Sequence, residues 1–255
     1  MNWKTFTAML ARDAHVARRN ALTLFLQVLL QPLLFVFVFG QVLVRGGIMV
    51  SGYKGMLLPG IMALAMLMTG VTAVSMPIIM ELITKEIEDR LLAPMETKWL
   101  AVEKVVAGMV QSLIAGVVVL PAAWLLLGRS TGLSFDHPIQ LAIMMFLVAL
   151  LAAAGGLAMG CSVGQTHIGL LFSMVLAPMI MFGCVYYPWS ILKGFSILKY
   201  AVLVDPLVYA SEGLRGTLAP QVPHMPIAVV ITVLAAADLA LIAFALNRFH
   251  RKTIA

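Results

Sequence analysis

The chain has 255 residues, of which 62% are hydrophobic and only 11% are charged, and its mean hydropathy is +1.02. A soluble globular domain carries about 25% charged residues, so this composition excludes an ordinary water-soluble protein. The net charge of +6 does not indicate nucleic-acid binding, because the basic residues lie in short segments between long apolar runs, as in membrane proteins.

The apolar runs approach or exceed the roughly 20 residues that a helix needs to cross a bilayer. They are apolar on all sides instead of alternating, which favours helices over the strands of a closed barrel. We therefore expect one all-α integral membrane domain, residues 1–255, with six spans; Pro32 is expected to kink the first, and Pro178 lies inside the fifth. The predicted spans are residues 21–44, 56–80, 105–127, 138–163, 168–186 and 227–246.

The N-terminal residues 1–20 precede the first span. Trp3, Phe6 and Leu10 recur at near-helical spacing among basic residues. This pattern predicts an amphipathic helix lying at the membrane surface. An ordinary basic flank of the first span is the alternative. A cleaved signal peptide is not expected, since the apolar run that follows is too long.

The most charged window of the chain, residues 81–104, follows the second span, and its first part, residues 81–98, carries the pattern of a separate helix. Ile83, Ile87 and Leu91 stand four residues apart and share one face of a helix, and Pro94 disfavours its continuation. We expect a short amphipathic cytoplasmic helix whose apolar face can enter a groove on a partner protein. A solvated charged loop is the alternative.

The segment before the last span, residues 187–226, contains five prolines. It is too interrupted to cross the bilayer and too apolar to be a solvated loop. Eleven of the seventeen Lys and Arg residues, Lys104 among them, fall on the side that holds both chain ends. The positive-inside rule therefore predicts cytoplasmic termini and places residues 187–226 outside.

Small residues in the fourth span form a repeated Gly-x-x-x-Gly pattern. Gly156, Gly160 and Gly164 would share one face, where two helix backbones can approach closely, either within the subunit or at a dimer contact. Cys161 and Cys184 have no metal or disulfide spacing and are interpreted as packing residues.

Two further residues suggest other classes of protein. Ser162 lies in a formal Gly-x-Ser-x-Gly match, which would suit a serine hydrolase only if a strand preceded it. Asp238 is the only acidic residue well inside a predicted span, and it could line a pathway, relay protons or simply hydrogen-bond within the bundle.

Three stretches carry a resemblance to a known family. They are Leu57-Leu-Pro-Gly-Ile61, Glu86-Ile-Glu-Asp-Arg-Leu-Leu-Ala-Pro94 and Asp205-Pro-Leu-Val-Tyr-Ala-Ser-Glu-Gly-Leu-Arg215. In this order, and with this number of spans, the chain resembles the permease subunits of type-2 ATP-binding-cassette transporters, a group that includes nodulation-factor and multidrug export permeases.

The resemblance implies a role for each region. The N-terminal helix would be an interfacial elbow, and the external segment would form short re-entrant helices. The ATPase-coupling residues would be Ile83, Glu86, Ile87, Glu88, Arg90, Leu91, Leu92 and Pro94. The external set would be Asp205, Pro206, Tyr209, Glu212 and Arg215.

The sequence contains no Gly-x-x-x-x-Gly-Lys-Ser/Thr phosphate-binding loop. We therefore expect no catalytic or metal-binding residues and no bound cofactor in this chain; ATP and Mg²⁺ would be held by partner subunits. The partners expected are two ATP-binding-cassette ATPases, a second copy of the chain and membrane lipid.

The predicted function is export of amphipathic or hydrophobic molecules, such as drugs, lipids or lipid-linked glycans, across a bacterial inner membrane. A carrier coupled to ions or protons through Asp238 is one alternative, and an intramembrane serine hydrolase using Ser162 is another. Neither alternative accounts for the amphipathic segment after the second span.

Overall fold

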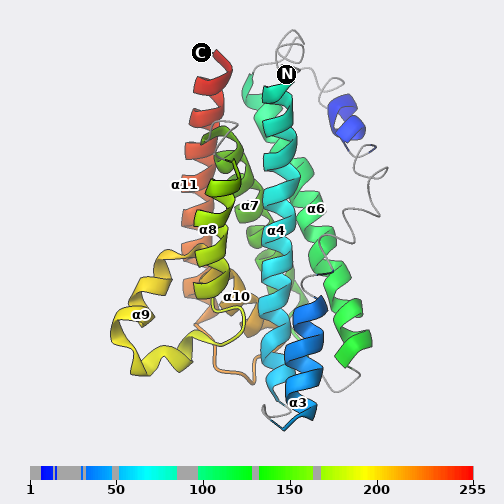
Figure 1. The fold of residues 1–255 in the computed structure, drawn as a ribbon, viewed down its shortest axis with the longest axis vertical. Helices are drawn as coiled ribbons and strands as arrows, with labels where there is room; N and C mark the ends of the chain where they lie inside the picture. Colours follow the sequence, from blue (N-terminus) through cyan, green and yellow to red (C-terminus); the bar gives the residue numbers. More distant parts are fainter. Residues whose placement is uncertain are drawn as a thin grey trace.

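The computed structural model describes residues 7–13, 15, 30, 33–47, 52–84, 97–127, 132–162 and 168–254, and these residues contain helices but no strand. Four helices are long and apolar enough to cross a membrane: α4 (Tyr53–Ile83), α6 (Thr97–Leu127), α7 (Pro138–Ser162) and α11 (Ile227–Ile254). They run side by side as a bundle (Figure 1). An all-helical membrane protein is therefore confirmed.

Shorter apolar helices occupy the first and fifth predicted spans. Residues 33–45 are helical, with a π-helical turn η1 (Val38–Val42) followed by α3 (Leu43–Arg45), and α8 (Ile168–Phe182) contains Pro178. Pro32, where a kink is predicted, lies outside the described residues. The count of six spans stays a prediction, because the described part of the chain contains four helices of spanning length.

Two long helices extend beyond the predicted spans. Helix α6 begins at Thr97, eight residues before the apolar run, and α11 continues through the basic tail to Ile254. Charged residues can belong to these helix ends because they find partners or solvent there. Helix α8 is shorter than predicted, since the backbone of Cys184 takes a positive φ of 52° and the chain turns away.

Helix α4 lies at the centre of the bundle and packs against α6, α7 and α10 (Pro206–Leu218). Glycines allow this close approach. A Cβ atom on Gly70 would lie 2.5 Å from the Cβ of Ala152 on α7, and one on Gly108 of α6 would lie 2.2 Å from Val74. Contacts this short between side chains cannot form, so these positions require glycine for the helices to pack as they do.

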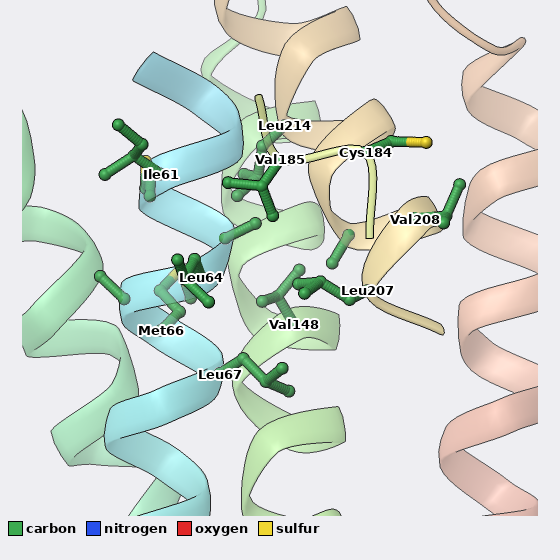
Figure 2. Close-up of a cluster of buried hydrophobic side chains, with 14 of the residues drawn as sticks. Ile61, Leu64, Met66, Leu67, Val148, Cys184, Val185, Leu207, Val208 and Leu214 are labelled. Atoms are coloured by element: carbon green, nitrogen blue, oxygen red, sulfur yellow. The ribbon is translucent and has the colours of Figure 1, made fainter. Parts of the chain in front are cut away.

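The segment between α8 and α11 folds into short helices: η3 (Trp189–Gly194), α9 (Ser196–Ala201), η4 (Val202–Val204) and α10. Helix α10 is almost entirely buried against α4, α7 and α11. Figure 2 shows side chains of α4, α7, α10 and the turn after α8 meeting in one apolar cluster. The segment thus forms short helices, one of them buried, while their re-entry into the membrane stays a prediction.

The bundle has two different ends, which we name for reference. The α10 end holds α3, α9 and α10, whereas the C-terminal end holds the last turns of α11 and the short helix at residues 7–13 (Figure 1). At the C-terminal end Phe249, Leu100 and Ala101 belong to one buried cluster, against which Met9 packs. Residues near both chain termini therefore lie on the same side of the bundle.

Gly60 on α4 offers a test of this packing. A Cβ atom there would lie 2.0 Å from the carbonyl oxygen of Val185, a backbone atom with little freedom to move. We expect Gly60→Ala to lower the free energy of unfolding by about 1–3 kcal/mol or more. Thermal denaturation in detergent, followed as loss of the monodisperse size-exclusion peak, measures the effect.

Gly169→Ala is the matched control, because Gly169 is exposed in the first turn of α8 and its Cβ would meet open space. This variant should be as stable as the wild type or slightly more so. Equal melting temperatures for the Gly60 and Gly169 variants would show that the approach of Val185 to α4 is not as close as described.

Candidate functional site

A buried ion pair lies at the α10 end of the bundle. Arg215 is completely buried, and Glu212, one helical turn before it on α10, is also inaccessible to solvent. The guanidinium donates to the carboxylate Oε1 of Glu212. Since neither charge reaches water, each must find its remaining hydrogen-bond partners inside the protein.

Arg215 obtains those partners from backbone carbonyls of two other elements. Its Nε donates to the carbonyl of Met56 on α4 at 3.2 Å, and one terminal nitrogen donates to the carbonyl of Cys184 at 2.9 Å. The same nitrogen lies 3.4 Å from the carbonyl of Val185. The fork of guanidinium donors thus joins α10, α4 and the turn after α8.

Glu212 makes complementary contacts with its two carboxylate oxygens. Oε1 accepts the backbone N–H of Trp189, at the start of η3, at 2.9 Å. Oε2 accepts the N–H of Met225, just before α11, at 3.0 Å. We call Glu212, Arg215 and their backbone partners the polar hub; it fixes five chain segments relative to one another.

The start of α10 places these two residues. Asp205 is the N-cap, and its Oδ1 accepts the N–H of Leu207 at 2.8 Å, while Pro206 occupies the first helical position. Burial raises the pKa of Asp205 to about 6, and the hydrogen bond from Leu207 acts in the opposite direction. Tyr209 packs, partly buried, against the apolar core.

The turn after α8 is held by two further hydroxyl groups. Ser211 on α10 donates to the carbonyl of Gly183 at 2.7 Å, and Tyr53 at the start of α4 donates to the carbonyl of Tyr186 at 2.8 Å. The Tyr186 ring stacks on Phe39 with centroids 5.5 Å apart. These contacts bind the turn to α10, to α4 and to the first apolar helix.

A second charged cluster lies at the C-terminal end. Lys104 on α6 is buried, and its Nζ lies 2.5 Å from Oδ2 of Asp13 and 3.0 Å from Oε1 of Glu81. Asp13 lies in the helical stretch at residues 7–13, and Glu81 lies in the last turn of α4. Lys104 therefore connects the predicted interfacial helix to the two long helices that flank the charged window.

Of the predicted coupling residues, the structure places Ile83 alone, as the exposed last residue of α4. The other members of that set lie outside the described residues: Glu86, Ile87, Glu88, Arg90, Leu91, Leu92 and Pro94. The helix bearing them is therefore still a prediction. It would connect the end of α4 to the start of α6.

The glycines of α7 face α4 of the same chain. A Cβ on Gly156 would lie 2.6 Å from the carbonyl oxygen of Val71, and one on Gly160 would lie 3.2 Å from the Cα of Ser75. This geometry is that of helix packing within one subunit. Gly164 lies outside the described residues.

The remaining candidate residues are not brought together with any of these clusters. Asp238 is buried on α11, and neither of its carboxylate oxygens has a hydrogen-bond partner among the described residues. Ser162 ends a helix and is exposed, whereas a nucleophile elbow needs a preceding strand. Within the described residues, no three His, Cys, Asp or Glu side chains gather closely enough to hold a metal ion.

Lys104 and its partners are functional candidates that the sequence analysis did not identify. Lys104 was expected in a cytoplasmic connection, but it lies two turns inside α6 and is 3% exposed. The signal that could have located it is the pair Glu103 and Lys104 next to an apolar run, because charged residues there require partners from neighbouring segments.

In the part of the chain that the structure describes, long apolar helices, the buried short helix α10 and charged clusters at the two ends define an α-helical integral membrane protein. A family model described as ABC-2 type transporter matches residues 4–219, and the chain belongs to this family. It is thus the membrane domain of an ATP-binding-cassette transporter, a family whose members associate with ATP-binding cassette subunits. A comparison with the curated proteins gave no match.

The polar hub predicts a large cost for removing one of its charges. Glu212→Gln leaves the Arg215 guanidinium buried without a counter-charge, and we expect a loss of about 3–5 kcal/mol in the free energy of unfolding. Glu212→Gln combined with Arg215→Gln should cost less than the sum of the two single changes. Thermal unfolding in detergent measures all three.

Asp136→Asn is the control for the Glu212 experiment, since Asp136 is an exposed acid near the same end of the bundle. Its melting temperature should match that of the wild type. Strictly additive effects of the Glu212 and Arg215 changes would show that the two side chains do not interact.

The Lys104 cluster makes a local prediction. Lys104→Gln removes the cation that holds Asp13, so backbone hydrogen exchange of residues 7–13 should become about tenfold faster, the equivalent of a lost charge-assisted hydrogen bond. Lys98→Gln changes an exposed lysine of the same helix and should leave the exchange unchanged. Unaltered exchange in Lys104→Gln would exclude this anchoring role.

Proposed function

We propose that this chain is the transmembrane subunit of an ATP-driven exporter that moves amphipathic or hydrophobic molecules out of a bacterial cell. It works as a pair of identical chains with two ATPase subunits bound at the C-terminal end. Drugs are the first candidate substrates, and lipids or lipid-linked glycans are the others. The C-terminal end, with both termini, faces the cytoplasm, and the α10 end faces outward.

One observation carries the mechanism: α4 connects the two ends of the bundle as a single helix. Its 31 residues correspond to a length of about 46 Å. At one end Glu81 contacts Lys104, and the predicted coupling segment follows directly. At the other end the carbonyl of Met56 accepts from Arg215 of the polar hub. A displacement of the coupling segment by ATPase closure would thus be passed along α4 to the outer re-entrant helices.

Pairing of two chains is supported by the packing of one. The interior of the described bundle is filled by two clusters of buried apolar side chains. One is centred on α4, and the other joins the first turns of α6 to the last turns of α7 and α11. Such an interior is packed at close to crystalline density and leaves no path for a bulky molecule. The route for substrate therefore runs along the surface between two copies, where α6 presents exposed Val110, Ile114 and Val117.

The coupling segment supplies the decisive experiment. The tagged chain, purified in mild detergent, should retain a stoichiometric ATPase subunit, and Ile87→Asp with Leu91→Asp should abolish this association. Two charges placed on an apolar docking face cost several kcal/mol in binding free energy, so retention should fall by at least about 100-fold. Immunoblotting and the ATPase activity of the eluate measure it.

Arg251→Asp is the control, because it introduces the same charge at an exposed position of the C-terminal end. It should retain the ATPase. The proposal would be contradicted if the chain purified without any ATPase in several detergents. It would also be contradicted if Ile87→Asp with Leu91→Asp left the association unchanged.

A further inference from the structure

An open cavity of about 410 Å³ lies at the α10 end, between α8 and the η4 turn that precedes α10. Its size falls in the range of about 300–1,000 Å³ that is usual for small-molecule sites. The walls are apolar with one exception. They consist of Pro178, Met179, Phe182, Leu198, Ala201, Val202, Val204, Pro206 and the acidic residue Asp205.

Asp205 places a carboxylate in this apolar wall. Its Oδ1 accepts the N–H of Leu207, but Oδ2 is covered and has no hydrogen-bond partner among the described residues. An acidic group in such surroundings gains from a nearby positive charge. Because Oδ2 is covered, a cation in the cavity would interact with the carboxylate through its charge and not through a hydrogen bond to this oxygen.

The surroundings of the cavity indicate where a ligand would come from. The η3–α9–η4 segment projects sideways from the bundle (Figure 1), and its Ile197 and Val204 side chains are exposed. Apolar side chains exposed at the end of a transmembrane bundle are stable in contact with lipid. A ligand entering from that phase must itself be lipophilic.

We propose that this cavity binds lipophilic monocations whose charge is delocalised or shielded by apolar groups, with Asp205 as the counter-charge. The walls accept the apolar groups, and the carboxylate discriminates against anions of the same shape. As an assignment of substrate class, this inference rests on the proposed export function. The binding itself does not require an ATPase.

Asp205 is the group that titrates in the cavity, because the neighbouring groups are either neutral or already have partners. Cys184 and Tyr187, in the turn after α8, sense its charge, but a thiol and a phenol are neutral between pH 5 and 7.5. On α10, Glu212 is paired with Arg215. On α9, Lys199 lies over the Trp189 ring, 4.7 Å from its centroid.

The test uses the purified chain and two probes of one shape, tetraphenylphosphonium and tetraphenylborate, in equilibrium dialysis at pH 7.5. The wild type should bind the cation, and Asp205→Asn should weaken this binding about tenfold without changing the borate result. Asparagine also caps helices well, so α10 keeps its N-cap. Ala201→Phe, which adds an aromatic ring at an exposed cavity position, should weaken binding too.

A pH series adds a readout that a structural role would not produce. Since the pKa of Asp205 is about 6, the carboxylate is ionised at pH 7.5 and mostly protonated at pH 5. Affinity for the phosphonium, whose charge is permanent, should therefore fall towards the Asp205→Asn level as pH falls through 6. The Asp205→Asn variant itself should show a flat profile, and Asp136→Asn should behave as the wild type.

Equal phosphonium binding by the wild type, Asp205→Asn and Ala201→Phe would overturn the assignment, as would equal affinity for the borate anion. These results are distinct from a failure of the export proposal. Phosphonium binding that depends on Asp205 in a chain without an ATPase would retain the site and refute the exporter. An ATPase complex whose phosphonium binding does not depend on Asp205 would support the exporter and refute the site.

Discussion

The structure depends on one constraint: the charge of Arg215 is held inside a helix bundle, away from water. A buried guanidinium has to be neutralised and its donors satisfied, and here that requires Glu212 together with carbonyls of α4 and of the turn after α8. An apolar pair of the same volume could give similar stability, but it would not require these particular hydrogen-bond partners and so would not fix the position of α10. The polar hub sets where α10 enters the bundle, and with it the start of α11.

Close backbone approach is the second requirement, and it explains why α4 occupies the centre. Gly60 admits the Val185 carbonyl at the α10 end, whereas Gly70, Gly108 and Gly156 bring α4, α6 and α7 together further along. Closely packed helices have little room to shift against one another, so they transmit displacement with little deformation. The same helix begins at the polar hub and ends beside Lys104, so both ends of the molecule share one mechanical element.

The candidate site was predictable in part. Residues 187–226 were expected to be external and to form short helices, and within them Asp205–Arg215 was singled out by the family resemblance. The structure shows a buried helix, α10, in this stretch. The partners of Glu212, the backbone N–H groups of Trp189 and Met225, could not be inferred, because any residue offers an N–H and only the fold selects two of them. Likewise Lys104 was assigned to a cytoplasmic connection, since hydropathy alone cannot show that Asp13 and Glu81 lie beside it.

By itself the sequence determined the membrane class, the helical fold and the family. Long apolar runs can satisfy their backbone hydrogen bonds in lipid only as helices, and the order of the family-like stretches can be read directly from the sequence. Tertiary structure alone decided which glycines face α4, that α6 begins within the charged window, and that an acidic residue lines an apolar cavity beside α8. The physical reason is range. Hydropathy acts through neighbours along the chain, whereas buried charges and close packing depend on residues from different elements, such as Lys104 and Asp13 or Arg215 and Met56.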